Sequence, residues 1–309
     1  MKNFVVTGAT SFIGKNFIEK ALKNGDTVNA VVRPNSKNRK GLTQSKNLKI
    51  IELDIAEISR LSDLVQKSDV FVHLAWGGTD PTSRNNPETQ KANVKASVSA
   101  LKTAIDLGCE KFLFAGSQAE YGIHKEPINE KTTCCPISEY GKAKLAFGQR
   151  AEKLCSGKKI SFIHLRIFSA YGAGDHHKSL INSCVDVFEN GGVLKTASLK
   201  QIWNYVHIKD LVEQIMRLSE LENKAISTYS VVNLASNDTR KLLDFVQSTY
   251  DLSSKKGFFL IGARHDNPEG TAWLNPDISK LKRLTGWEQE ISFEDGIKEM
   301  IDLTKTRNV

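Results

Sequence analysis

Short runs of β-forming residues alternate with longer amphipathic segments through the first half of the chain, and this alternation constrains the fold more than any other feature. After the first such run, Ile13, Phe17, Ile18, Ala21 and Leu22 repeat at the spacing of one helical face. Strands that alternate with helices form a parallel sheet with helices on both faces. The sequence therefore predicts a doubly wound α/β fold. Strands are expected at Asn3–Val6, Thr27–Val32, Leu48–Leu53, Val70–Leu74, Lys111–Ala115 and Ser161–Leu165.

A glycine-containing turn follows the first predicted strand directly. Gly8 permits a tight turn, and Gly14 permits close packing of helix on strand, so that free amides at the helix start face a pyrophosphate. Ser11 takes the place of the middle glycine and lets the backbone approach a phosphate less closely. A plain structural turn is the alternative, but the position at the N-terminus favours a dinucleotide site. The predicted contacts are Gly8, Thr10, Ser11, Phe12, Ile13 and Gly14.

The two halves of the chain differ in regularity, which predicts two domains. We expect a dinucleotide-binding Rossmann domain over residues 1–170, with a return segment at about 203–235. Residues 171–309 are expected to form a smaller C-terminal α+β domain that covers the carboxyl edge of the sheet. In this part a strand is expected near Ser227–Leu234, and helices near Ile208–Leu221, Asp277–Thr285 and Phe293–Leu303.

Composition and charge argue against several classes of protein. No apolar run approaches the roughly 18 residues of a membrane span, and Phe4–Val6 is too short for a signal-peptide core. The five cysteines have no C-x-x-C spacing, which disfavours a disulfide framework or a zinc site. The net charge of +8 comes from dispersed lysines rather than a basic patch interleaved with aromatic residues. We expect a cytoplasmic protein with no metal, no membrane and no nucleic-acid partner.

The end of the second predicted strand indicates which dinucleotide binds. An enzyme for NAD carries Asp or Glu about 20 residues beyond the glycines, where it bonds the ribose 2′-hydroxyl. Here Arg33 lies 19 residues beyond Gly14 (33 − 14 = 19), and no acid is near it. A guanidinium binds a 2′-phosphate through charge-assisted hydrogen bonds. We therefore predict NADP(H), with NAD as the alternative; an ordinary exposed arginine is the purely structural interpretation.

The next two strand ends are expected to border the same cofactor. Asp54 follows the third strand, where it accepts from the adenine amino group or caps the following segment. Small Ala75 leaves room for the cofactor after the fourth strand, and Trp76 either walls the pocket or packs in the core. Ile55 and Leu74 flank these positions and are included among the predicted cofactor contacts.

Ser117, Tyr140 and Lys144 form the predicted catalytic set. Ser117 follows the fifth strand, while Tyr140 and Lys144 lie four residues apart on one face of a predicted helix. An ammonium near a phenol stabilises the phenolate and lowers the phenol pKa from about 10, so that it exchanges a proton near neutral pH. Ser117 would orient the same substrate oxygen. Tyr-x-x-x-Lys is common by chance, but its phase with the glycine turn and Ser117 favours catalysis.

These motifs resemble those of the extended short-chain dehydrogenase/reductases that act on nucleotide sugars as epimerases, dehydratases or reductases. The match runs over nearly the whole chain. It includes Thr7–Gly14, Asp54, His73–Ala75, Asn93, Gly116–Gly122, Pro127–Glu130, Tyr140–Lys144, Leu165–Gly174, Tyr205–Asp210 and Gly286–Trp287.

The resemblance implies hydride transfer at a sugar carbon beside a nicotinamide. Tyr140 would be the acid/base, Lys144 would also hold the nicotinamide ribose, and Phe168 would flank the nicotinamide. Asn93 would contact the cofactor, and a homodimer is expected. The smaller domain would bind the nucleotide sugar, with Arg264 at its diphosphate. The expected substrate contacts are Ser117, Gln118, Ser169, Tyr205 and Arg264.

Departures from the family pattern favour a reductase. The resembling 4,6-dehydratases carry an Asp-Glu pair after the Ser117 position, whereas Gln118-Ala119 cannot transfer protons. Ser169 replaces an asparagine common in the epimerases, and Trp203-Asn204 replaces an Arg-Asp pair. Together with Arg33, these features predict NADPH-dependent reduction of the 4-keto group of a nucleotide-diphospho-deoxysugar. A nucleotide-sugar epimerase is the alternative, and a non-catalytic dinucleotide sensor is the third hypothesis.

Overall fold

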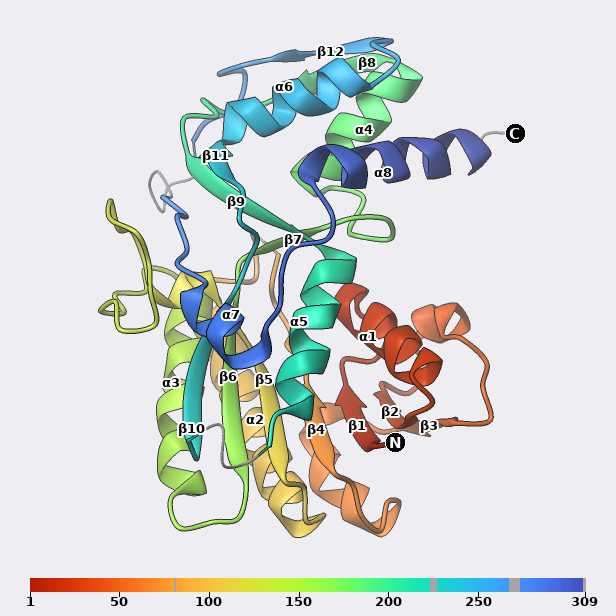
Figure 1. Cartoon of the computed structure of the whole chain (residues 1–309), viewed down its shortest axis with the longest axis vertical. Coiled ribbons are helices and arrows are strands. Elements are labelled where there is room, and N and C mark those ends of the chain that lie inside the picture. The colour runs from red at the N-terminus through yellow and green to blue at the C-terminus, as the bar shows by residue number, and fades with distance from the viewer. Residues whose placement is uncertain (81, 223–226, 267–272, 308–309) are drawn as a thin grey trace.

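A seven-stranded parallel sheet forms the centre of the larger of two lobes (Figure 1). The computed structural model describes residues 1–80, 82–222, 227–266 and 273–307. The predicted doubly wound α/β fold is confirmed. The strands of this sheet are β1 (Asn3–Thr7), β2 (Thr27–Val32), β3 (Leu48–Glu52), β4 (Val70–His73), β5 (Lys111–Ser117), β6 (Ser161–Ile167) and β10 (Tyr229–Leu234).

The strand order β10-β6-β5-β4-β1-β2-β3 reverses beside β1. The chain passes outward from β1 to β3 and then returns to β4 on the other side of β1. Thr7 and His73 end β1 and β4 at the same level, and Thr7 Oγ1 lies 2.8 Å from His73 Nδ1 in a buried hydrogen bond. In sheets of this type, ligands bind at the carboxyl ends of the strands at such a reversal.

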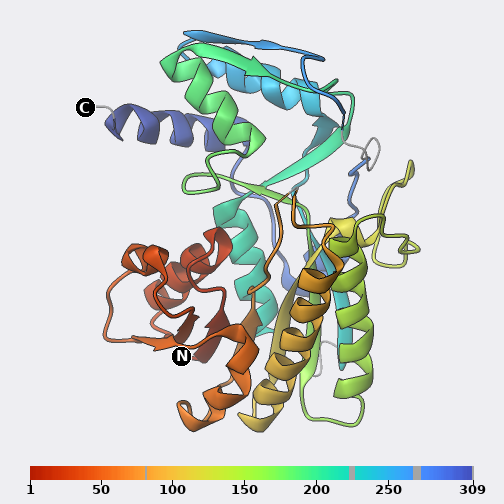
Figure 2. The ribbon, with the colours of Figure 1, turned by 180° about the vertical axis from the view of Figure 1, so that it is seen from behind.

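Alternate residues of the central strands pack on opposite faces of the sheet. Phe4 and Val6 of β1 belong to one apolar core, and Val5 belongs to the other. Figures 1 and 2 show these helical layers from the front and from behind. The first core includes α1 (Phe12–Lys23), α5 (Ile208–Glu220) and α7 (Ser279–Thr285); the second includes η2 (Ile55–Asp63), α2 (Pro87–Asp106) and α3 (Glu139–Cys155).

The small lobe has its own apolar core of buried aromatic and aliphatic side chains. It contains a three-stranded sheet of order β11-β9-β7 and a two-stranded sheet of β12 and β8. Two further 3-10 turns, η1 (Lys37–Gly41) and η3 (Gln118–Glu120), belong to the large lobe. The small-lobe elements are β7 (Ser169–Tyr171), α4 (Leu180–Asn190), β8 (Gly192–Lys195), β9 (Ile202–His207), β11 (Thr239–Lys241), α6 (Leu242–Leu252), β12 (Gly257–Leu260) and α8 (Phe293–Arg307).

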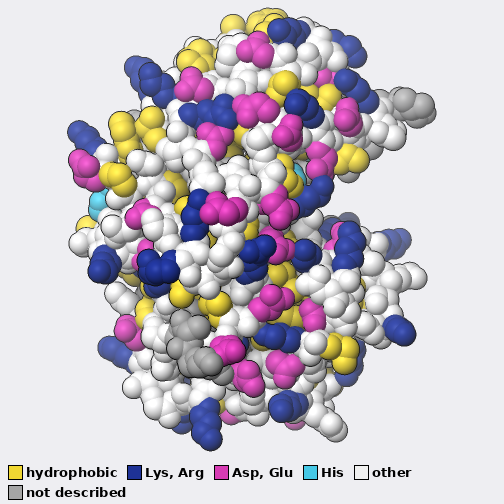
Figure 3. Space-filling model, in the orientation of Figure 1, with side chains coloured by type: hydrophobic (Ala, Val, Ile, Leu, Met, Phe, Trp, Pro, Cys, Tyr) yellow, Lys and Arg dark blue, Asp and Glu magenta, His cyan; other side chains and the backbone are white. Residues whose placement is uncertain are grey.

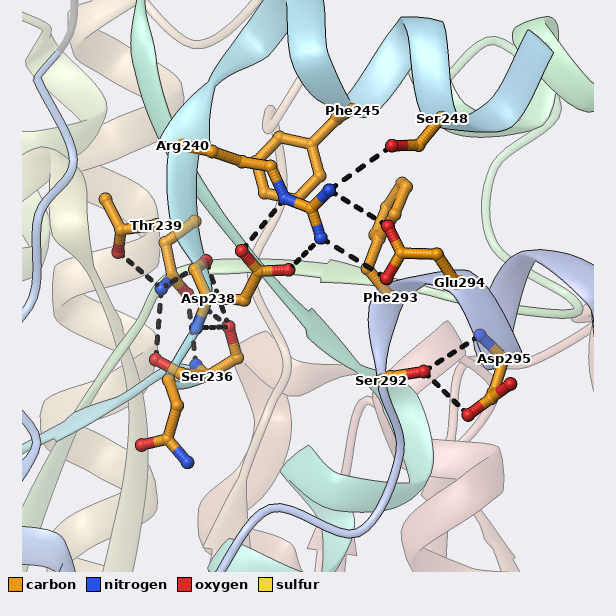
Figure 4. Close-up of polar contacts among 12 residues, drawn as sticks. Ser236, Asp238, Thr239, Arg240, Phe245, Ser248, Ser292, Phe293, Glu294 and Asp295 are labelled. Carbon is orange, nitrogen blue, oxygen red and sulfur yellow. Dashed lines mark hydrogen bonds and ion pairs between the residues drawn. The ribbon is translucent and has the colours of Figure 1, made fainter. Parts of the chain in front are cut away.

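Arg240 joins three elements of the small lobe (Figure 4). Its guanidinium donates to the carboxylates of Asp238 at 2.9 Å and Glu294 at 2.9 Å. The same group lies 4.6 Å from the ring centroid of Phe245 and 5.4 Å from that of Phe293. β11, α6 and α8 therefore meet around one cation whose charge is compensated and whose faces are covered by aromatic rings.

The chain passes between the lobes several times. β9 pairs with β7 and β11 in the small lobe, whereas α5 and β10, which follow it, belong to the large lobe.

Positive and negative side chains intermingle on the face drawn in Figure 3. No helix in the described part of the chain has the length and apolar character needed to cross a membrane.

Candidate active site

The glycine turn packs directly against the end of β4. Gly8 has a φ of +68°, and a Cβ atom there would lie 2.7 Å from the Ala75 amide nitrogen. A Cβ atom at Gly14 would lie 2.3 Å from the Gly8 carbonyl oxygen. Ser11 caps α1, because its hydroxyl accepts from the Gly14 amide at 3.0 Å. No acidic residue lies in the first turn of α1, so its N-terminal dipole is left for an anion.

Ser117, Tyr140 and Lys144 meet in one cavity of about 320 Å³ at the carboxyl edge of the sheet. Ser117 ends β5, and the other two residues lie in the first turns of α3. The cavity also borders the start of α1, so the structure brings the predicted catalytic set and the phosphate turn together. The remaining lining residues are Ser11, Phe12, Ile13, Leu74, Trp76, Thr79, Ala115, Gly116, Ile167 and Phe168.

The expected lowering of the Tyr140 pKa by Lys144 is wrong for this structure. Burial raises the pKa of Tyr140 above its ordinary value of 10.0, and a hydrogen bond from the Ser117 hydroxyl only partly opposes this. The Lys144 ammonium lies 5.5 Å from the centroid of the Tyr140 ring and donates elsewhere. Tyr140 is therefore a protonated phenol at neutral pH.

Lys144 is buried among backbone and aromatic groups. Its Nζ donates to the Ala115 carbonyl oxygen at 2.6 Å and lies 3.9 Å from the centroid of the Trp76 ring. Burial lowers the pKa of Lys144 to about 7, and the negative charge of Glu120 opposes that shift. Both interpretations left open for Trp76 hold, because this residue lines the cavity and also packs against the second apolar core.

Arg84 is a further residue of this site that the sequence interpretation missed. Its guanidinium lies 5.4 Å from the centroid of the Tyr140 ring and donates to the Ser138 hydroxyl at 3.3 Å. The Arg84 carbonyl oxygen accepts from the Tyr140 amide at 3.0 Å. Its positive charge lowers the pKa of Tyr140, against the larger effect of burial. Arg84 precedes α2 in an irregular segment, and no motif in the sequence points to it.

A second cavity, of about 580 Å³, lies beyond the end of β2. It brings Arg33 together with Lys37 and Asp54, so two cations face one space. The Asp54 side chain accepts from the Ala56 amide at 2.9 Å, which is the capping role left open above, and it also lines this cavity. Ile55 instead packs at the margin of the second apolar core.

Asn93 acts on the loop after β4 instead of lining either cavity. Its Nδ2 donates to the Gly77 carbonyl oxygen at 2.8 Å, and its Oδ1 accepts from the Gly77 amide at 2.9 Å. The side-chain amide of Asn93 therefore binds both the N–H and the carbonyl group of Gly77, and in this way it shapes the loop that carries Trp76. Thr10 lies in the turn between Gly8 and Ser11.

Most of the predicted substrate contacts lie outside the catalytic cavity. The Tyr205 ring is buried in the small-lobe core, 5.1 Å from Phe245 and 5.9 Å from Tyr171 between ring centroids, which corrects its expected place. Ser169 begins β7 and pairs with Tyr205, and Gln118 begins η3. Arg264 follows β12, with its amide donating to the Thr196 carbonyl oxygen at 2.9 Å. Among the described lining residues, Ser117 alone represents the predicted substrate set.

Comparison with known families agrees with this geometry. A model of the NAD dependent epimerase/dehydratase family matches residues 4–235, a stretch that begins in β1, ends after β10 and contains the catalytic cavity. The chain belongs to this family. The resemblance stated from the sequence motifs is thereby confirmed.

Curated members of the family match over most of their length at low identity. The low-salt glycan biosynthesis protein Agl12 of Haloferax volcanii is 26% identical, over 96% of this chain and 97% of that protein. The uncharacterized UDP-glucose epimerase YtcB of Bacillus subtilis is 26% identical over 95% of each. The UDP-glucuronate 4-epimerase of Thermodesulfobacterium geofontis is 25% identical, over 99% of this chain and 97% of that enzyme.

Solved structures at low sequence identity share the fold. MoeE5 in complex with UDP-glucuronic acid and NAD aligns with a TM-score of 0.87 at 22% identity, over 99% of this chain and 100% of that one. A UDP-glucose-4-epimerase from Stenotrophomonas maltophila, with bound NAD and formylated UDP-arabinopyranose, aligns with a TM-score of 0.88 at 19% identity over 100% of both chains.

Proposed function

We propose that this family member is an NADPH-dependent reductase of the 4-keto group of a nucleotide-diphospho-deoxysugar. The observation that supports it most directly is the meeting of Ser117, Tyr140 and Lys144 in the cavity bordered by the glycine turn. A protonated phenol beside a hydroxyl suits proton transfer to a sugar oxygen. The narrower assignment to reduction rests on the cation pair of the second cavity and on the residues after Ser117.

The residues of both cavities fit a nicotinamide dinucleotide. The turn at Gly8 has no room for a Cβ atom, and the N-terminus of α1 has no acid to repel a pyrophosphate. Arg33 and Lys37 would hold a 2′-phosphate, which a carboxylate in their place would repel. When bound, NADPH supplies the hydride. Lys144 and Phe168 would then lie beside the nicotinamide ribose and ring.

The proton comes from Tyr140. Because burial raises the pKa of this phenol, it stays protonated at neutral pH and donates to the oxygen that forms at C4. The Ser117 hydroxyl polarises the carbonyl by hydrogen bonding to the same oxygen. Hydride at C4 and the proton at its oxygen convert the ketone into an alcohol, and solvent returns a proton to the tyrosine.

The residues after Ser117 favour reduction over dehydration. Gln118 and Ala119 begin η3 next to the catalytic serine. Water loss from a sugar needs an acid and a base at such positions, and neither an amide nor a methyl group transfers protons. The site therefore offers one proton-transferring phenol, which is what a ketone reduction requires.

A sugar-nucleotide epimerase is the second candidate, because two relatives at 25–26% identity are named as epimerases. The two functions separate in one assay of NADPH oxidation against CDP-, dTDP-, GDP- and UDP-linked 4-keto-6-deoxysugars. A reductase consumes one NADPH for each ketone reduced. An epimerase interconverts sugar nucleotides at catalytic enzyme concentration without added NADPH. Cofactor binding with no turnover of either kind would contradict both proposals.

Arg33→Asp tests the choice of cofactor. The change removes a charge-assisted contact to the 2′-phosphate, and such hydrogen bonds contribute about 1.5–3 kcal/mol, so the preference for NADPH over NADH should fall about tenfold or more. The measurement is kcat/KM for both cofactors. Arg60→Asp makes the same charge change on η2, outside the cavity, and should leave the ratio as it is. An unchanged ratio in Arg33→Asp would contradict the NADP(H) assignment.

A further inference from the structure

A buried network of charged side chains lies directly behind Ser117. Glu120 Oε1 accepts from the Ser117 amide at 2.8 Å and lies 2.9 Å from His164 Nε2, while Glu120 Oε2 accepts from Arg166 Nε at 3.1 Å. The exposed fractions of the Glu120, His164 and Arg166 side chains are 0%, 0% and 5%. The carboxylate therefore anchors the backbone of the catalytic serine in a site without solvent.

Two glycines make room for this network against the elements of the active site. A Cβ atom at Gly116 of β5 would lie 2.4 Å from His164 Nε2 and 2.6 Å from Glu120 Oε1. A Cβ atom at Gly148 of α3 would lie 2.5 Å from His164 Cε1. Gly148 follows Lys144 by four residues, so it lies on the face of α3 that bears the catalytic pair. The imidazole thus separates β5 from that face.

Charged and titratable groups surround the Glu120 carboxylate on each side. From β6, His164 and Arg166 face it. Burial alone would raise the pKa of Glu120, but its interactions with these two side chains lower it overall. From α3, Tyr140 and Lys144 lie within its field, and its negative charge raises the pKa of both groups.

The outer part of the network has further neighbours, although the buried Nη1 of Arg166 has no hydrogen-bond partner among the residues that the structure describes. The Tyr229 hydroxyl of β10 lies 3.1 Å from His164 Nδ1, so the imidazole has a partner at each nitrogen. The Arg166 guanidinium lies 4.4 Å from the centroid of the Tyr121 ring, and Cys134 adds a thiol close by.

We propose that Glu120 is a positioning residue for the reaction at Ser117, Tyr140 and Lys144, acting through its hydrogen bond to the Ser117 backbone and through its charge. This inference rests on the proposed reductase function. It assigns a role to a residue that does not line the catalytic cavity. Replacing a buried ion pair by neutral groups often leaves stability nearly unchanged, so positioning and folding can be measured separately.

Glu120→Gln removes the charge and keeps a carbonyl oxygen for the Ser117 amide. Because the charge raises the pKa of Tyr140 and Lys144, its loss should lower both, and the alkaline limb of kcat for ketone reduction should move to lower pH. Glu189→Gln is the matched control. Glu189 is also buried and accepts from the Ser254 amide at 2.7 Å, but it lies on α4 of the small lobe. Its pH profile should match that of the unchanged protein.

A second readout needs no substrate. The neutral carbonyl of Glu120→Gln binds the Ser117 amide more weakly than the carboxylate does, so hydrogen exchange around Ser117 should be faster in this variant and unchanged in Glu189→Gln. Because Glu120→Gln leaves Arg166 unpaired, the double variant Glu120→Gln/Arg166→Met removes both charges and should fold while keeping the shifted alkaline limb.

The outcomes separate the two proposals. Absence of turnover in the unchanged protein would overturn the reductase function while leaving the exchange measurement to decide the role of the network. Turnover with an unmoved alkaline limb and unmoved exchange would overturn the positioning role. If Glu120→Gln and the double variant Glu120→Gln/Arg166→Met both fail to fold, the positioning role is overturned too, because the network would then be structural.

Discussion

At the scale of single residues, burial decides the proton chemistry of Tyr140. Its phenol is held in the acid form, so Tyr140→Phe should lower ketone turnover by about 10²–10⁴-fold, the usual contribution of a positioned acid. NADPH affinity should stay unchanged, since the ring remains. Turnover and cofactor titration measure the two effects. Tyr250→Phe alters a tyrosine of the small-lobe core and serves as the control. Full turnover in Tyr140→Phe would remove the proposed mechanism.

Lys144 is a second residue at which burial opposes charge. Its pKa falls from 10.5 to about 7, so below pH 7 the folded protein holds a buried ammonium at a cost in stability. Lys144→Met should raise the thermal midpoint at pH 6 while abolishing turnover. Between pH 7 and about 10 the unfolded chain binds a proton that the folded protein does not. As the pH increases through this range, the unfolding free energy of the unchanged protein should therefore rise relative to that of Lys144→Met, by up to about 1.4 kcal/mol per pH unit.

Chemical denaturation at several pH values measures that difference, because the groups shared by the two proteins cancel. Parallel pH dependence of the two unfolding free energies would show that Lys144 titrates at its ordinary pKa in the folded state.

At the scale of elements, the join between β1 and α1 depends on glycine. Gly8→Ala would bring a Cβ atom 2.7 Å from the Ala75 amide nitrogen at a positive φ, so the turn has to move away from β4. We expect loss of dinucleotide binding and a lower thermal midpoint. Gly25→Ala shares a positive φ of 84° but meets nothing within 4 Å, so it isolates the conformational effect, roughly 1 kcal/mol. Equal cofactor affinity in the two variants would contradict this role for the turn.

The strands of the large sheet could be predicted from sequence because most of them are short buried apolar runs that alternate with helical segments. The expected strand at Lys111–Ala115 differs from β5 only at its end, which reaches Ser117. The short strands of the small lobe could not be predicted in this way. β8 and β12 have four residues each and are defined by pairing between segments far apart in the sequence. β4 is equally short but is buried at every position, whereas β8 and β12 are each buried at only one position and lack such a buried run.

The candidate site, too, could be predicted from the sequence only in part. The four-residue spacing predicted that Tyr140 and Lys144 share one helical face. It contains no information on how deeply the phenol is buried, and burial raises the pKa of Tyr140 instead of lowering it. Arg84 reaches the site from an irregular segment, which no motif could indicate. Glu120 was part of a recognised motif, yet its partners His164 and Arg166 come from a strand more than 40 residues away (164 − 120 = 44).

At the scale of the whole molecule, the small lobe depends on the Arg240 cluster of Figure 4. Arg240→Met keeps the aliphatic contact with Phe245 and Phe293 but leaves Asp238 and Glu294 without their cation. We expect faster hydrogen exchange in α6 and α8 and unchanged exchange in β1 and β5. NADPH affinity should persist, because both cavities lie in the large lobe. Hydrogen exchange that stays unchanged in both lobes of Arg240→Met would show that the cluster contributes little to the stability of the small lobe.

The last strand of the large sheet is also the last to be synthesised. β6 ends at Ile167, but its neighbour β10 begins at Tyr229, after β7, β9 and α5 have left the ribosome. Until then β6 presents an unpaired, largely apolar edge, which is a template for association between nascent chains. A chain that stopped near residue 170 would therefore lack the strand that closes the large sheet, and a shortened version of this lobe would need β10 joined to it from a separate stretch of the sequence.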